Sequence, residues 1–333
     1  MRKLSLRQRP ARVAFTLGLT ALCVWYIVAK IDLGESWRVL SESRLWLVAL
    51  AFAILMLAVV PFSWRWQRLL RARGIDEGVP WLLRAYLVSY TAGQLLPTSL
   101  GGDATRIVET SRRHRGRGGA VAGSVLLERG LGGIATLLLG AVGFVLAIGR
   151  YSVGPYLWLE LAMALATVAL ALVLFSKSAR RPLRLAEPLL ARVRLSGPVR
   201  ALYLGLHEYR SDAQLVGSML AVTAVVQSVR VLAIWLCGEA VGVHLSPLPY
   251  FVMGPMFFLV MLAPFTVNGL ALREAFFVSF LGRLGVSADQ AFAAGFLFLL
   301  LSFALSLPGG LIWAVERLRG SAQLSARTTV PAR

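Results

Sequence analysis

Two short segments hold the residues best suited to binding an anion within an otherwise apolar chain. Each combines a proline–glycine turn, at 97–102 or 264–269, with an arginine shortly after it, Arg106 or Arg273. A helix that starts at such a turn directs free backbone N–H groups and the positive end of its dipole towards the turn. Arginine adds a planar guanidinium that binds phosphate or carboxylate through paired hydrogen bonds. The pattern therefore predicts two anion-binding half-helices.

The candidate residues for binding an anionic head group lie on these segments or on neighbouring apolar runs. They are Arg106, Arg273, Asp103, Glu274, Asn268, Gly102, Gly269, Arg230 and Gln94. The turns themselves are assigned to Pro97, Gly101 and Pro264, and a second group of candidates consists of Glu128 and Arg129. Ionisable groups within apolar runs are costly, so each is a candidate for function by default.

Several of these residues have an equally physical structural interpretation. Arg106 can pair with Asp103 three residues earlier and hold its segment together, and Asp103 suits the N-terminal cap of a helix. Glu274 can pair with Arg106 or Arg230, or it can carry a proton.

The other candidates also have two interpretations. Glu128 and Arg129 can anchor a helix at the membrane surface as readily as line a pathway. Asn268 and Gln94 can bind a head group or satisfy the interrupted backbone.

The elements that must position these residues are transmembrane helices. The 333 residues are 57% hydrophobic and 15% charged, with a formal net charge of +19, whereas soluble domains carry roughly 25% charged residues. A bilayer is crossed by about 20 apolar residues. Runs of this kind occur at about 13–29, 45–63, 120–148, 156–176, 215–238 and 290–315. The pattern excludes a soluble enzyme, a disulfide scaffold and a nucleic-acid-binding domain, and it predicts an all-α polytopic membrane protein with about six spanning helices.

Two further apolar stretches, 80–114 and 249–283, contain the two turns and are predicted to be re-entrant helical hairpins. Cytoplasmic loops carry an excess of Lys and Arg. The basic residues of 2–12 and Arg65, Arg68, Arg71 and Arg73 are placed on the cytoplasmic side. The arginines of 112–117 and the basic residues of 177–213 lie on the same side only if hairpin 80–114 leaves the membrane on the face where it entered. We therefore expect a multi-pass protein of the plasma or inner membrane, with both termini in the cytoplasm.

The two hairpins belong to units of opposite orientation, at about 45–148 and 215–315. Three special residues recur 167 positions later in the second unit: Pro97, Gly102 and Arg106 become Pro264, Gly269 and Arg273. Inverted repeats with broken helices near the membrane midplane are typical of transporters. The sequence predicts an inverted repeat within one membrane domain, 1–318, followed by a disordered cytoplasmic tail at 319–333.

The cysteines and histidines indicate no metal or redox chemistry. Cys23 and Cys237 lie within apolar runs, where a thiol behaves as a small hydrophobe, and the three histidines lack the spacing of metal ligands. We expect no disulfide, no metal site and no cofactor.

The two signature segments resemble those of one membrane protein family. Residues 96–106 with 124–129, and residues 264–274 with 284–287, are similar to the paired motifs of the flippase-like family that includes the transmembrane region of lysylphosphatidylglycerol synthases. The resemblance implies movement of an anionic or glycosylated lipid between leaflets. Two-part members add a soluble domain that aminoacylates phosphatidylglycerol. Because only residues 319–333 follow the last predicted span, we expect no such domain here and do not carry lysyl transfer over.

The function expected from the sequence is therefore a flippase for an anionic phospholipid or a polyprenyl-phosphate-linked glycolipid, not an enzyme. The alternative is a scaffold that does not transport, acting with a glycosyltransferase or other cell-envelope proteins. A membrane-embedded lipid-modifying enzyme is disfavoured, because the sequence shows no catalytic set of His, Asp or Cys. The expected partner is a membrane lipid with an anionic head group, and no nucleic acid is expected.

Overall fold

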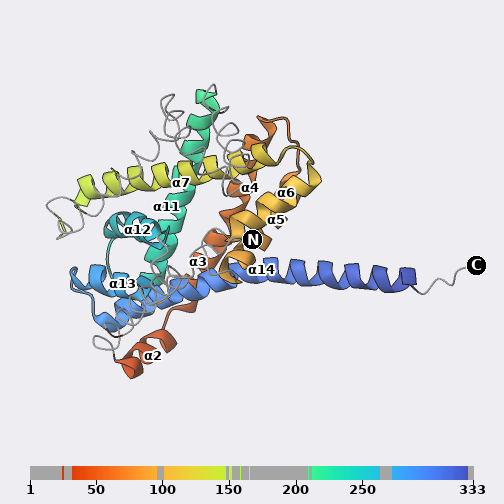
Figure 1. Ribbon diagram of the computed structural model, residues 1–333. Helices are drawn as coiled ribbons and strands as arrows, with labels where there is room; N and C mark the ends of the chain where they lie inside the picture. The colour runs from red at the N-terminus through yellow and green to blue at the C-terminus, as the bar shows by residue number, and fades with distance from the viewer. Residues whose placement is uncertain are drawn as a thin grey trace, which may run out of the picture.

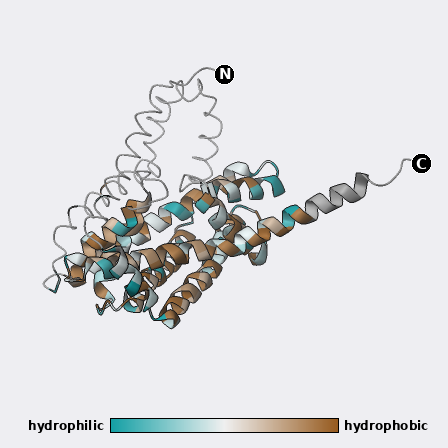
Figure 2. Cartoon of the chain, turned by 90° about the horizontal axis from the view of Figure 1, so that it is seen from below, coloured by the Kyte–Doolittle hydropathy of each residue, from teal (hydrophilic) through white to brown (hydrophobic). Residues whose placement is uncertain are grey.

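The computed structural model describes residues 32–95, 101–147, 212–262 and 272–328, together with isolated residues between them. Every regular element in these ranges is a helix (Figure 1). Four helical stretches are long and apolar enough to cross a membrane: Leu45–Arg71, Gly118–Ala147, Ala213–Ala240 and Ala288–Leu318. Hydrophobic residues predominate along these helices (Figure 2). The predicted all-α membrane fold is confirmed, while the spans expected at 13–29 and 156–176 lie outside the described residues.

Apart from the helix at 33–41, which the sequence analysis does not predict, the helices fall close to the predicted runs. The bounds in chain order are α2 Leu33–Ser41, α3 Leu45–Leu57, α4 Val59–Arg71, α5 Val79–Leu95, α6 Gly101–Arg113, α7 Gly118–Ala147, α11 Ala213–Ala240, α12 Leu248–Leu262, α13 Leu272–Gly282 and α14 Ala288–Thr328. Helices α5 and α6 correspond to the first predicted hairpin, and α12 and α13 to the second. The connecting turns, which include Pro97, Pro264, Asn268 and Gly269, lie outside the described residues.

Helices α3 and α4 form one apolar stretch with a break at Ala58. Pro61 lacks an N–H group and cannot bond the carbonyl of residue 57, which accounts for an interruption one turn earlier. Beyond the break, α4 continues to Arg71, although the apolar run ends near residue 63. The predicted end of this span is therefore too early, and Arg65 belongs to the helix and not to a loop after it.

The two halves of the chain pack against each other reciprocally. Helix α7 of the first half contacts α12 of the second, and α14 of the second half contacts α5 of the first. Helices α3 and α11 pair with each other. A two-fold relation requires such an exchange, because equivalent elements must make equivalent contacts. The packing fits the predicted inverted repeat, whose orientation in a membrane stays a prediction.

Glycines allow close approach of the backbones at both reciprocal contacts. A Cβ on Gly143 of α7 would lie 2.5 Å from the carbonyl oxygen of Phe251 on α12. A Cβ on Gly309 of α14 would collide with the backbone of Leu87 on α5. Small residues at helix crossings are the usual route to close packing in membranes, where lipid competes for apolar side chains.

The outer ends of α5 and α6 lie together. Glu77, just before α5, pairs with Arg113 at the end of α6 (Oε1 to Nε, 2.6 Å) and with His114 (Oε1 to Nε2, 2.9 Å). Arg117 donates from Nη1 to the carbonyl of Arg73 at 2.7 Å. The two helices thus start and finish at the same end of the bundle, which fits the predicted hairpin.

The second pair of helices shows a weaker form of the same arrangement. The Nε2 of Gln290, at the start of α14, lies 3.5 Å from the carbonyl of Val241 and 3.4 Å from that of Gly242. The loop before α12 and the start of α14, which follows α13, therefore meet at one end of the bundle.

The last helix is longer than expected. Helix α14 runs to Thr328 and extends beyond the bundle at its C-terminal end (Figure 1). The sequence predicts a disordered tail from residue 319, whereas the structure describes α14 as helix up to Thr328. The backbone hydrogen bonds of the span continue into the polar sequence, as they do in α4.

Candidate functional site

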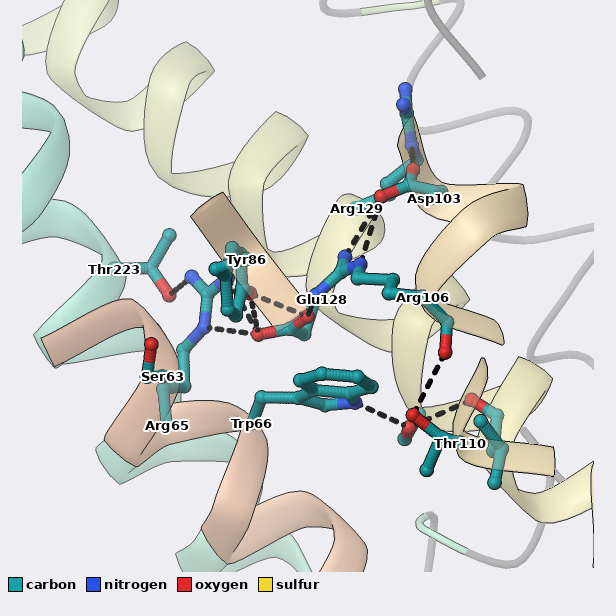
Figure 3. A network of polar contacts seen from close by, with 12 residues as sticks. Ser63, Arg65, Trp66, Tyr86, Asp103, Arg106, Thr110, Glu128, Arg129 and Thr223 are labelled. Atoms are coloured by element: carbon teal, nitrogen blue, oxygen red, sulfur yellow. Dashed lines mark hydrogen bonds and ion pairs between the residues drawn. The ribbon is translucent and has the colours of Figure 1, made fainter. Parts of the chain in front are cut away.

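A network of buried charges lies inside the helix bundle, centred on Glu128 of α7 (Figure 3). Its carboxylate accepts hydrogen bonds from Arg65 of α4 (Nε 3.1 Å, Nη2 3.0 Å) and from Arg106 of α6 (Nη1 2.5 Å). The hydroxyl of Tyr86 on α5 donates to the same carboxylate at 2.8 Å. Arg65, Arg106 and Glu128 have side chains no more than 5% exposed. Two guanidinium groups and a phenol therefore surround one carboxylate, an arrangement suited to any oxyanion.

A second carboxylate extends the network. Asp103, in the first turn of α6, accepts from Arg106 (Nε 3.0 Å, Nη2 2.9 Å) and pairs with Arg129 of α7. Arg65, Arg106 and Arg129 carry three positive charges, whereas Asp103 and Glu128 carry two negative charges. The network holds one surplus positive charge when all five groups are ionised.

Aromatic and hydroxyl side chains fix the positions of the guanidinium groups. Arg106 lies over the rings of Trp66 (4.8 Å to the centroid) and Tyr86 (4.5 Å). The Trp66 indole donates to Ser124 at 3.0 Å, and Ser124 precedes Glu128 by one turn of α7. The Nη1 of Arg65 donates to Thr223 of α11 at 2.6 Å. Five helices, α4 to α7 and α11, therefore contribute to the network.

Four of the predicted site residues meet in this network. The suggested pair between Arg106 and Asp103 is present, and Glu128 and Arg129 join it. Glu128 is buried among the helices and does not lie on the surface of the bundle. Sequence reasoning missed Arg65, because the predicted span ends before it.

Arg230 of α11 occupies a separate position between the halves. Its Nη1 donates to Gln227 at 2.7 Å, and its guanidinium lies 4.1 Å from the ring centroid of Phe258 on α12. On α5, Tyr90 lies beside Tyr86 of the network, with ring centroids 6.3 Å apart. Among the described residues, Arg230 has no carboxylate within ion-pair distance.

Arg273 makes no contact with Arg106 among the described residues. Its guanidinium lies 6.0 Å from the ring centroid of Phe257, and its Nε and Nη1 are buried without a hydrogen-bond partner in that part of the chain. The repeat offset of 167 residues explains the difference: the position equivalent to Glu128 is Gly295. The second half therefore lacks the acid that holds Arg106. Glu274 is buried on the same helix.

The remaining candidates have structural contacts. Gln94 donates from Nε2 to the carbonyl of Ser302 on α14 at 3.3 Å. Gly101 and Gly102 are buried at the start of α6, where a Cβ on Gly102 would collide with the carbonyl of Ser89 on α5. This close approach explains the glycine, which the sequence had assigned to head-group binding.

The fold and the buried network define the class: a polytopic helical membrane protein with charged groups in its interior. Residues 13–310 match the family model described as the lysylphosphatidylglycerol synthase TM region, so the chain belongs to that family. The resemblance inferred from the two motifs is thereby confirmed. A search among curated proteins finds no match.

Proposed function

We propose that this protein moves a lipid with an anionic head group between the leaflets of its membrane, without altering the lipid chemically. The head group would travel through the bundle interior, past Arg230 and the network around Glu128. Membership of a lipid-related membrane family supports this class of substrate.

One observation carries the proposal: Arg230 is a cation inside a predicted span with only neutral neighbours in the described part of the chain. Charged side chains at such a depth are costly, and those retained generally pair with another group or serve a pathway. Gln227 and the ring of Phe258 stabilise the guanidinium without neutralising it. A phosphate is the ligand that would complete this environment.

The network supplies a second place for the same head group. Arg65, Arg106 and Tyr86 already hold the carboxylate of Glu128, which is chemically close to a phosphate oxygen pair. A head group arriving from Arg230 would exchange with this carboxylate, so that no guanidinium is left without a counter-charge. The ring of Tyr86, which belongs to the network, lies beside that of Tyr90 on α5.

A liposome assay with the purified full chain tests the proposal. Phosphatidylglycerol labelled on one acyl chain with a fluorophore is placed in both leaflets, and an impermeant reductant quenches the outer leaflet. The wild type should let the reductant quench more than the outer half of the label. Arg230→Gln should abolish the extra quenching, whereas Arg44→Gln, an exposed arginine outside the interior, should not.

Three outcomes decide against the proposal. If correctly folded protein moves neither phosphatidylglycerol nor a polyprenyl phosphate, anionic lipid transport is excluded. Equal movement by wild type and Arg230→Gln excludes the proposed path. A new lipid mass after incubation would instead indicate an enzyme.

A further inference from the structure

A pocket of about 710 Å³ lies beside the C-terminal half of α6, away from the Glu128 network. Its lining residues are Ile107, Val108, Ser111, Arg112, Arg115 and Gly116. Apolar side chains form one part of the wall and two arginines the other. The pocket is therefore amphipathic along the helix axis.

The four arginines of the segment 112–117 divide into two pairs with different roles. Arg113 pairs with Glu77, and Arg117 donates to the backbone of Arg73, so both hold the loops together. Arg112 and Arg115 are exposed, line the pocket, and make no ion pair with the described residues. Only this second pair is available for a ligand.

The pocket lies at the boundary between apolar and polar parts of the molecule. The apolar helix Gly118–Ala147 begins two residues after Gly116 of the pocket. Val108 precedes Arg112 by four residues, about 6 Å along the axis of α6, and its side chain is 46% exposed. In a bilayer crossed by α7, the two arginines would face the head groups, and Val108 and Ile107 would face the upper acyl chains.

We propose that this pocket binds an anionic phospholipid, with the phosphate between Arg112 and Arg115 and the start of an acyl chain along Val108 and Ile107. A zwitterionic lipid offers the same apolar chains but adds a positive charge near the two guanidinium groups. The partial negative charge at the end of α6, about half an elementary charge, is outweighed by the two arginines. The proposal does not depend on transport, because it concerns occupancy of a surface site about 9 Å along α6 from Arg106.

Native mass spectrometry of the full chain in mild detergent tests this site. The probes are dioleoyl phosphatidylglycerol, dioleoyl phosphatidylcholine and inorganic phosphate. The wild type should bind phosphatidylglycerol more tightly than phosphatidylcholine. The double variant Arg112→Gln/Arg115→Gln should weaken phosphatidylglycerol binding roughly 25-fold, about fivefold for each arginine.

The matched control is Arg68→Gln/Arg71→Gln, which removes the same charge from the end of α4, outside the pocket. It should leave phosphatidylglycerol binding within about twofold of the wild type. Val108→Gln keeps both arginines and should also weaken lipid binding, while melting temperatures verify that each variant is folded.

Several results would overturn the proposal. Equal losses in the two double variants would indicate a general charge effect without a site. Equal binding of both lipids would remove the role of the anionic head group. Full competition by inorganic phosphate, or no effect of Val108→Gln, would identify a small-anion site instead of a lipid site. Because lipid movement is not measured, these results are independent of the transport assay.

Discussion

The carboxylate of Glu128 lies 3.0 Å from the guanidinium of Arg65, although 63 residues separate them and the sequence had suggested a loop position for Arg65. Both side chains are almost completely buried. Removing one member of a buried pair leaves an uncompensated charge, which costs about 3–5 kcal/mol. Arg65 therefore lies in the interior of the bundle, where it neutralises the buried carboxylate of Glu128.

The first prediction concerns the stability of this network. Glu128→Gln should lower the free energy of unfolding by about 3–5 kcal/mol, because Arg65 and Arg106 lose their shared counter-charge. The measurement is unfolding in mixed detergent micelles, followed by tryptophan fluorescence. Glu109→Gln is the control, since its pair with Arg84 is partly exposed and should contribute at most about 1 kcal/mol. Equal losses for the two variants would contradict a central role for Glu128.

The second prediction concerns the two reciprocal helix crossings. Gly143→Ala and Gly309→Ala should each destabilise the protein by about 1–3 kcal/mol, because the new methyl group overlaps the backbone of the facing helix. Gly130→Ala has no atom within 4 Å of the added Cβ and should be neutral or stabilising through helix propensity. Melting temperatures of the three variants provide the comparison. If Gly130→Ala is as harmful as the others, the close crossings are not the cause.

The positions of the helices could be predicted because each depends on local signals. Apolar runs located α7 and α11, and the proline–glycine turns separated α5 from α6 and α12 from α13. Local signals did not predict the C-terminal ends of two helices. In α4 and α14, backbone hydrogen bonding continues after the apolar residues finish, so hydropathy alone placed the boundaries too early.

The site was only partly predictable for a different reason. The Arg106–Asp103 pair lies within one helix turn and follows from spacing. The contacts of Glu128 with Arg65 and Tyr86 join three helices, and no local pattern indicates which residues will face each other. The second half lacks an equivalent of Glu128 because Gly295 stands there, a position that matters only once the repeat offset is applied.

The third prediction separates Arg230 from Arg106. Arg230→Gln should leave the melting temperature nearly unchanged, because it removes a cation without stranding a described carboxylate. Arg106→Gln should lower it, because two carboxylates, those of Asp103 and Glu128, each lose a partner. Thermal unfolding of the two purified variants makes the comparison. A large loss of stability in Arg230→Gln would assign that arginine to structure and not to head-group binding.

The fourth prediction concerns the orientation of the first hairpin. Gly78, just before α5, and Gly116, just after α6, are both exposed. Single cysteines placed there, with Cys23 and Cys237 replaced by serine, should react with an impermeant maleimide only from the cytoplasmic side. A cysteine at Ser246, before α12, should react only from the opposite side. Gly78 and Gly116 are expected on one side because the ion pair between Glu77 Oε1 and Arg113 Nε, at 2.6 Å, holds the start of α5 and the end of α6 together.

Two controls make the labelling decisive. Gly282, at the end of α13, should label from the same side as Ser246 if α12 and α13 form the second hairpin. Detergent-permeabilised cells should label at all four positions, which shows that each thiol is reactive. If Gly78 and Gly116 label from opposite sides, then α5 or α6 crosses the membrane, and the arginines of 112–117 lie on the wrong face for the inverted repeat. That result would also remove the physical basis for an interior path, because the start of α6 would no longer lie within the membrane.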